Sequence, residues 1–395
     1  MSVNQDIRSG ADNVQTIPFF STEFYRYYAE TPGLAAANHY IATLAKEYLL
    51  ALEHVIKDHL PASEAVGKGH HERIKTKQLL IFYPAMQWVH LMALNLAMQQ
   101  VSNTGPNLKV EHRLCLMYNP GRDYSGEVIN ATEWLSYKLA CKSLAEFANV
   151  KMFASDQELA DHYGHLLELD KPMRLHPQYL VQLGQPRELQ KVDKQGQSIG
   201  LYFGDAKVEK GFTQLPDLIE RLIPAIGEND KIVIQYVSQG NCRSVLAAEE
   251  QIQDIAEREP RLRVTPSYLS SEQMQTILSS LDLFVFTYDA MHYRNKSSGF
   301  LWMLADKACK LIFLGESWLV REAKRLGMNA YLCGVRDLPD FLHCLLAEAN
   351  QENIERSEAI PLTVDAPVRD YRKRLNSSFF DWLLSDARDY SLMGQ

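Results

Sequence analysis

The chain has 395 residues, 46% of them hydrophobic and 23% charged, a composition that predicts a globular protein large enough for two hydrophobic cores. Its 41 basic and 49 acidic residues give a net charge of -8 at pH 7, and no long basic block is present to neutralise a phosphate polymer. This charge pattern excludes nucleic acid as the main partner. The 6 cysteines are scattered without a C-x-x-C pair or a metal-ligand spacing, which predicts reduced core cysteines, a cytoplasmic location and no metal site.

The segment from Leu79 to Met98 is apolar enough to raise the question of a membrane span. Pro84, Gln87 and His90 interrupt it, so we expect a buried strand followed by a helix instead. Peripheral contact with a membrane surface stays open as an alternative. No cofactor is expected.

In the first half of the chain, β-rich runs alternate with helical patterns. The expected strands cover 24–28, 78–83, 110–117 and 150–153, and the expected helices cover 34–60, 86–100, 131–147 and 156–167. Residues 61–77 have the composition of an exposed loop. Strands and helices that alternate at this length predict parallel βαβ units.

A hinge is expected at 172–197, because this stretch contains several prolines and glycines and has no clear periodicity. A second series follows. Its expected strands are 199–203, 231–237, 262–266, 281–286, 311–314 and 329–332, and its expected helices are 213–223, 242–256, 271–280, 297–307, 318–325 and 338–349. The tail 367–384 has a helical pattern. We therefore expect an N-terminal domain at 1–180, a C-terminal domain at 181–366 and a closing helix within 367–395 that packs toward the first domain.

The first candidate site lies where the apolar strand Ile199–Phe203 ends at Gly204 and leads through Lys210 and Gly211 into a helix. A glycine-bearing turn before a helix lets backbone N–H groups and a lysine approach an anion. Lys210 is thus a candidate phosphate ligand. An ordinary strand-to-helix connection with a surface lysine fits the same pattern.

The second candidate site is the loop from Thr287 to Gly299, which follows a buried strand and therefore lies at the carboxyl end of the sheet, where open α/β folds bind ligands. Ser297, Ser298 and Gly299 at the start of a helix can donate to a pyrophosphate, and Arg294 and Lys296 add positive charge. The alternative is that the two serines only cap the helix.

The half from Ile199 to Gly334 resembles the donor-binding domain of family 4 glycosyltransferases with the GT-B fold. The resemblance is carried by Phe203-Gly-Asp-Ala-Lys-Val-Glu-Lys-Gly211, by Leu269-Ser-Ser-Glu272, by the strand Leu281–Phe286, by Ser298-Gly299 and by Lys310–Leu314. It implies an α/β protein of two Rossmann-like domains that face each other across a cleft. It also implies a retaining, metal-independent transfer of a sugar from a nucleotide-diphosphate donor to a glycan, lipid or protein acceptor.

The resemblance also assigns candidate roles to residues. The donor-binding residues would be Gly204, Lys207, Lys210, Gly211, Arg294, Ser297, Ser298 and Gly299. His112 and Asp289 would act near the reacting hydroxyls, although a single histidine in a strand is more often a packed side chain. Gly33, Asn119 and Arg122 would contact the acceptor, and an ordinary turn or polar loop is the alternative for each.

Three departures oppose this assignment. Asp205 stands where many family members have an arginine, Met303 stands where they have an acidic residue for the donor ribose, and Asn295 and Lys296 replace an expected glutamate. The competing hypothesis is a degenerate GT-B scaffold that acts as a non-catalytic binding or regulatory partner in a glycan pathway. An epimerase or hydrolase is a weaker third hypothesis, because the loops lack an acidic cluster.

Overall fold

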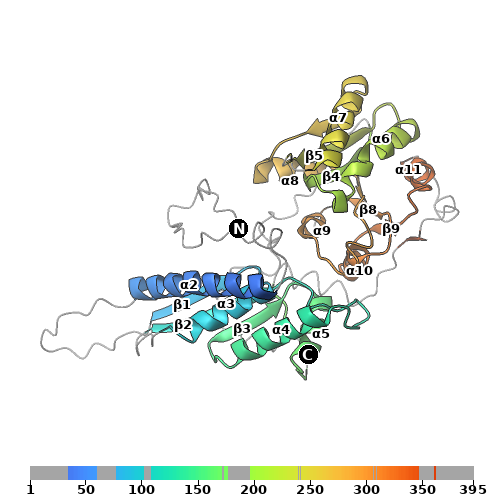
Figure 1. The fold of residues 1–395 in the computed structure, drawn as a ribbon. Helices are drawn as coiled ribbons and strands as arrows, with labels where there is room; N and C mark the ends of the chain where they lie inside the picture. The colour runs from blue at the N-terminus through green and yellow to red at the C-terminus, as the bar shows by residue number, and fades with distance from the viewer. Residues whose placement is uncertain are drawn as a thin grey trace, which may run out of the picture. The chain divides into compact units, whose positions relative to one another are not determined.

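The chain divides into two units, Met1–His176 and Pro177–Gln395, and each contains a parallel or mostly parallel β-sheet (Figure 1). The structure, a computed structural model, describes residues 34–59, 77–101, 108–170, 173–176, 196–238, 240, 242–305, 307, 309–346 and 360–361. The run 24–28, the loop 61–77, the hinge 172–197 and the tail 367–384 lie wholly or largely outside these residues.

The N-terminal unit is built on strands β1 (Lys77–Tyr83), β2 (Leu108–Leu116) and β3 (Val150–Ala154), which pair in parallel in the order β1-β2-β3. Its helices are α2 (Leu34–His59), α3 (Trp88–Met98), α4 (Ala131–Ala145) and α5 (Gln157–Leu166). Each expected strand and helix within the described part of this unit is confirmed, with bounds that differ by a few residues. The alternation of β and α patterns therefore produces the parallel sheet that it predicts.

The central strand β2 separates two kinds of interior. Val110, Leu114 and Leu116 belong to the apolar core that the helices share. Glu111 and Arg113, at the alternate positions, are also buried, and their ion pair is satisfied within the sheet because Arg113 Nε donates to Glu111 Oε1 at 2.7 Å. Lys151 Nζ donates to Glu111 Oε2 at 2.7 Å from β3. Because buried charges are tolerated only when paired, this trio explains how a sheet position can hold two charged residues.

The C-terminal unit contains a larger sheet in the order β10-β9-β8-β7-β4-β5-β6, parallel except for β10. The strands are β4 (Ser198–Asp205), β5 (Lys231–Val237), β6 (Leu262–Thr265), β7 (Leu283–Phe286), β8 (Lys310–Phe313), β9 (Ala330–Leu332) and β10 (Ile360–Pro361). From β4 the chain builds outward to β6, then returns to the other side of β4 with β7 and builds outward again. This is the doubly wound order, and the switch point lies between β4 and β7.

The helices of this unit are α6 (Leu215–Leu222), α7 (Arg243–Arg258), α8 (Ser271–Ser280), α9 (Gly299–Leu304), α10 (Trp318–Arg325) and α11 (Leu338–Leu346). Two differences from expectation concern the switch point. The chain after Gly211 first forms a short 3₁₀ turn, Phe212–Gln214, before α6 begins. The helix expected at 297–307 is shorter, since α9 begins at Gly299 and ends at Leu304.

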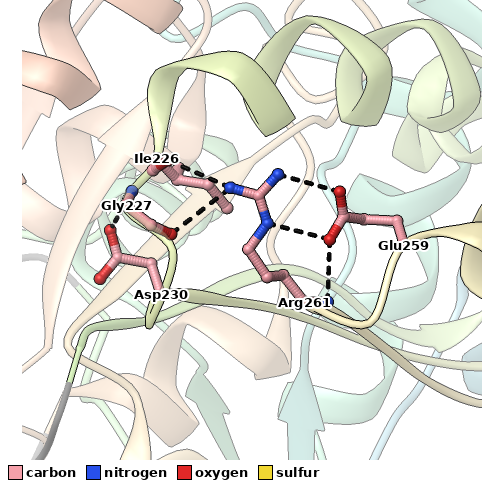
Figure 2. Close-up of polar contacts among 5 residues, drawn as sticks. All are labelled: Ile226, Gly227, Asp230, Glu259 and Arg261. Carbon is pink, nitrogen blue, oxygen red and sulfur yellow. Dashed lines mark hydrogen bonds and ion pairs between the residues drawn. The ribbon is translucent and has the colours of Figure 1, made fainter.

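At the edge of this sheet where β5 and β6 begin, one arginine ties two loops together (Figure 2). The carboxylate of Glu259 accepts hydrogen bonds from Arg261 Nε and a second guanidinium nitrogen, both at 2.9 Å. A third guanidinium nitrogen of Arg261 donates to the carbonyl of Ile226 at 3.2 Å. Asp230 closes the neighbouring turn by accepting from the backbone N–H of Gly227 at 2.8 Å. The guanidinium therefore serves the fold, with acceptors supplied by the protein itself.

No helix in the described parts of the chain is long and apolar enough to cross a membrane. The segment from Leu79 to Met98 forms most of β1 and the helix α3, in which Val89, Leu91 and Leu94 are completely buried. The apolar character of this segment is thus used for packing inside the N-terminal unit.

Candidate functional site

The loop that leaves β4 at the switch point is held in shape by a buried tyrosine. The hydroxyl of Tyr202 donates to the carbonyl of Asp205 at 2.5 Å and accepts from the backbone N–H of Lys207 at 3.0 Å. On the other side of the strand, Gln235 of β5 accepts from the backbone N–H of Gly204 at 3.0 Å and donates to the carbonyl of Ser267 at 2.7 Å. The path of the chain out of β4 is therefore fixed by side-chain hydrogen bonds before the loop begins.

This loop packs directly on the loop that leaves β7. Gly211 has a φ of +80°, and a Cβ placed on it would lie 2.0 Å from the carbonyl oxygen of Thr287, so no other residue fits without displacing backbone. Thr287 Oγ1 donates to the carbonyl of Lys210 at 2.9 Å, and the backbone N–H of Asp289 donates to the carbonyl of Glu209 at 3.0 Å. The two loops singled out in the sequence are thus joined at the carboxyl ends of β4 and β7.

Lys210 extends from the first loop along this junction. Its Nζ lies 3.2 Å from the point that a Cβ on Gly204 would occupy and 5.9 Å from the ring centroid of Tyr288. The ammonium group makes no hydrogen bond or ion pair with the described residues. Burial lowers the pKa of Lys210, and the nearby Asp205 carboxylate partly opposes this shift. A half-buried cation without a counter-ion, at the switch point of a doubly wound sheet, is a group suited to hold a ligand anion.

Tyr288 connects Lys210 with the start of α9. Its side chain is buried, its hydroxyl lacks a hydrogen bond of standard geometry, and burial raises its pKa to about 12, against a small opposing effect of the nearby Ser298 hydroxyl. Ser298 is itself buried, and its side chain does not cap α9. Lys210 and Ser298 are therefore both neighbours of one tyrosine ring, and that tyrosine is a component of the site that sequence reasoning did not single out.

The remaining candidates on these loops have more local partners. Lys207 forms an ion pair with Asp205 at 3.6 Å. Asp289 Oδ1 accepts from the backbone N–H of His292 at 2.6 Å, which closes the turn of the second loop. The carbonyl of Arg294 accepts from a guanidinium nitrogen of Arg321 on α10 at 2.6 Å.

Ser297 is half-buried and Gly299 is exposed. Met303 on α9, the position at which the family resemblance predicts an acidic residue, is half-buried.

Candidates in the N-terminal unit are distributed differently. His112 lies inside β2, is buried, and its Nδ1 is 3.0 Å from the hydroxyl of Tyr83, with which its ring also stacks. Burial lowers its pKa to about 4, so the imidazole is neutral at pH 7. Its catalytic role stays a prediction. Asn119 accepts from the backbone N–H of Arg122 at 2.7 Å in the loop after β2, and Gly33 lies outside the described residues.

No known protein family and no curated protein matches this chain in sequence. Similarity is found among solved structures. One, from a study of enzymatic glycosyltransfer with retention by trehalose-6-phosphate synthase, has 11% sequence identity and a TM-score of 0.50, covering 93% of this chain and 81% of that one. Another, described as trehalose-6-phosphate from E. coli bound with UDP-2-fluoro glucose, has 12% identity and a TM-score of 0.50, covering 92% and 80%. At these identities the likeness concerns the fold. The chain has the mixed α/β GT-B fold of glycosyltransferases, as its resemblance to family 4 implied.

Proposed function

We propose that this protein is a glycosyltransferase that moves a sugar from a nucleotide-diphosphate donor to an acceptor. The observation that carries this proposal is the half-buried ammonium of Lys210, which forms no hydrogen bond or ion pair with a described residue, at the switch point of the C-terminal sheet. Two solved structures of similar fold support it, since one concerns glycosyltransfer with retention and the other contains UDP-2-fluoro glucose. A cytoplasmic location stays a prediction, as does the kind of acceptor.

The reaction breaks the bond between the anomeric carbon of the sugar and the diphosphate oxygen, and forms a bond from that carbon to an acceptor oxygen. Negative charge develops on the leaving diphosphate, and a preorganised cation beside it lowers the barrier. Lys210 is the group proposed for this task. Gly204 leaves room for the ligand beside the ammonium, and Gly211 keeps the loop against Thr287. We further propose that the transfer is retaining and metal-independent, as the family resemblance implies.

Other residues would take secondary roles in this scheme. Lys207, Arg294 and the segment 297–299 would contribute to binding the donor, and His112 and Asp289 would act near the reacting hydroxyls. Arg122 would contact the acceptor.

The test is the Lys210→Ala variant. Removal of one group that stabilises a leaving anion costs about 3–4 kcal/mol, so the transfer rate should fall on the order of a hundredfold or more. Lys231→Ala is a matched control, because Lys231 is an exposed lysine at the opposite end of a strand in the same sheet. Release of nucleoside diphosphate from a panel of sugar nucleotides measures the rate. A variant that keeps activity within a few-fold of the unmodified protein would remove Lys210 from the mechanism.

A second candidate function is a non-catalytic GT-B scaffold that binds a partner in a glycan pathway. It is favoured by the Asp205 carboxylate beside the proposed diphosphate position and by Met303 in α9, where the resemblance predicts an acidic residue. A thermal-shift panel of nucleoside diphosphates separates the two. A nucleotide at a hundred times its dissociation constant adds about 2.7 kcal/mol of stability. Stabilisation that is lost in Lys210→Ala supports the transferase, and the absence of any shift supports the scaffold.

A further inference from the structure

The ammonium group of Lys210 lies beside an aromatic ring and a glycine. Its Nζ is 5.9 Å from the ring centroid of Tyr288 and 3.2 Å from the point that a Cβ on Gly204 would occupy. The ammonium makes no hydrogen bond or ion pair with a described residue. Because a cation within about 6 Å of the centre of an aromatic face is attracted by the negative face of the ring, Tyr288 supplies an attraction that holds this cation in place.

The ring of Tyr288 is itself held by other rings. Tyr288 is buried, and its ring centroid lies 4.6 Å from that of Tyr293 and 5.5 Å from that of Phe286, the last residue of β7. Tyr293 is also buried, and its carbonyl accepts from the backbone N–H of Trp318 at 3.0 Å, where α10 begins. The ring beside Lys210 is thus anchored to a strand and to a helix, so little of its conformational freedom is lost when a ligand binds.

Two consecutive residues of the second loop contact the two ends of Lys210. Thr287 Oγ1 donates to the carbonyl of Lys210 at 2.9 Å, and the ring of Tyr288 lies beside its Nζ. A lysine side chain is costly to order, because it has many rotamers to lose. Since the protein fixes both the main chain and the ammonium, part of this cost is met before a ligand arrives.

The carboxylates of the same two loops have other partners. Asp205 pairs with Lys207 at 3.6 Å, and Asp289 Oδ1 accepts from the backbone N–H of His292 at 2.6 Å. A carboxylate beside the ammonium would occupy its N–H donors and compete with an anionic ligand. An aromatic face attracts the same ammonium and leaves the donors free. A ring is therefore a suitable partner for a lysine that binds an anion.

We propose that Tyr288 is a positioning residue of the donor site, and that its ring holds the Lys210 ammonium in place for the diphosphate of the ligand. This inference rests on the proposed function, because it explains how Lys210 is kept ready for the leaving diphosphate. Tyr288 acts through Lys210 and does not touch the ligand. The required property is the negative face of the ring and not the hydroxyl, which is buried.

The experiment is a calorimetric titration of the full chain with inorganic pyrophosphate, which presents a diphosphate without a base or a sugar. Tyr288→Phe keeps the ring and should bind pyrophosphate within about twofold of the unmodified protein. Tyr288→Leu removes the aromatic face, and its dissociation constant should rise about fivefold to tenfold. Tyr331→Leu is the control, because Tyr331 of β9 also packs on another ring, that of Phe341, in the same unit. Its affinity for pyrophosphate should not change.

A replacement that preserves the shape of the ring separates its electrostatic effect from its packing. Pentafluorophenylalanine incorporated at position 288 has nearly the shape of phenylalanine, but the face of its ring no longer attracts a cation. We expect its dissociation constant for pyrophosphate to be about fivefold higher than that of Tyr288→Phe. This pair of variants decides the question even if Tyr288→Leu does not fold.

A double-mutant cycle tests whether Tyr288 acts through Lys210. Lys210→Gln removes the cation but keeps a hydrogen-bond donor, so weak binding of pyrophosphate remains measurable. In this background the phenylalanine and pentafluorophenylalanine variants should bind within about twofold of each other, because no ammonium is left beside the ring.

Equal affinities of these two ring variants when Lys210 is present would overturn the inference. A difference between them that is as large without Lys210 as with it would make Tyr288 a structural residue and would overturn it too. In either case the proposed function survives if Lys210→Gln alone weakens pyrophosphate binding. If Lys210→Gln binds pyrophosphate as well as the unmodified protein does, the donor site and this inference both fail.

Discussion

Arg261 and Arg122 are the same side chain in two opposite situations. Arg261 donates to the Glu259 carboxylate and to backbone carbonyls at the edge of its sheet where β5 and β6 begin (Figure 2). Arg122 follows the carboxyl end of β2 and stacks on Trp134, and its buried Nε forms no hydrogen bond with a described residue. The first arginine joins loops, and the second is left available. The position of a charge in the sheet, together with what surrounds it, separates a structural role from a binding role more clearly than residue type does.

Lys210 extends this comparison to the C-terminal unit, because its ammonium forms no ion pair with a residue that the structure describes and lies at the carboxyl ends of its strands. Within the described residues, each unit therefore carries at least one cation without an ion pair at the end of the sheet where α/β folds bind ligands. Changes at the carboxyl ends should accordingly affect binding, whereas changes at Arg261 should affect stability.

Gly211→Ala should have the largest effect, because it should lower both stability and nucleotide binding. An alanine would place Cβ 2.0 Å from the carbonyl oxygen of Thr287 at a φ of +80°. We expect a loss of about 3 kcal/mol of unfolding free energy, measured by urea denaturation, together with loss of nucleotide stabilisation. Gly240→Ala is the matched control, because Gly240 also has a positive φ but no atom within 4 Å of the added Cβ. Equal losses in the two variants would show that backbone strain alone, and not the loop junction, sets the cost.

The pH dependence of stability tests whether His112 is a buried, neutral side chain of the N-terminal core. Burial lowers the pKa of His112 to about 4, while an unfolded histidine titrates near 6.5. Protons therefore bind the unfolded chain preferentially below pH 6.5, so this histidine lowers stability as the pH falls toward 4 and has no effect above 6.5. Between pH 7 and pH 5 the loss amounts to about 2 kcal/mol. Urea denaturation at both pH values measures the loss of unfolding free energy, which should be about 2 kcal/mol smaller in His112→Gln than in the unmodified protein. Equal losses in the two proteins would contradict the burial of a neutral His112.

Arg261→Gln tests directly whether Arg261 has a structural role. The ion pair with Glu259 lies near the surface, so its loss should cost about 1–2 kcal/mol of unfolding free energy. The Arg261 hydrogen bonds hold the pKa of Glu259 down to about 2. The contribution is thus complete above the usual carboxylate pKa and disappears as the pH falls toward 2. A smaller stability loss at pH 7 than at pH 3 would have the wrong sign for this mechanism.

The smallest expected effect completes the comparison. Arg122→Gln removes a guanidinium that has no hydrogen bond or ion pair among the described residues but lies 4.6 Å from the Trp134 ring centroid. Only this cation–π contact is lost, so the unfolding free energy should fall by about 0.5–1 kcal/mol. Urea denaturation measures this beside Arg261→Gln. A loss as large as that of Arg261→Gln would make Arg122 a structural arginine.

The fold could be predicted from sequence because it depends on local signals. The apolar run Leu283–Phe286 predicts a strand, and the amphipathic segment Leu215–Leu222 predicts a helix, each from a few neighbouring residues. Gly204 and Gly211 marked the loop after β4. What local patterns do not contain is the partner of each side chain: Tyr288 beside Lys210, or His162 without a hydrogen bond, follows from packing between segments distant in sequence. The end of α9 at Leu304 could not be predicted either, because no glycine or proline follows it to mark the end of a helix.

The ion-paired residues Glu111, Arg113 and Lys151 on β2 and β3 affect how the N-terminal unit folds. Arg113 pairs in register with Lys151, and both contact Glu111. A slip of β2 by one residue would turn the Glu111–Arg113 pair toward the apolar core and separate it from Lys151. Such mispaired versions of the sheet are therefore penalised electrostatically during folding, which favours the native register between β2 and β3.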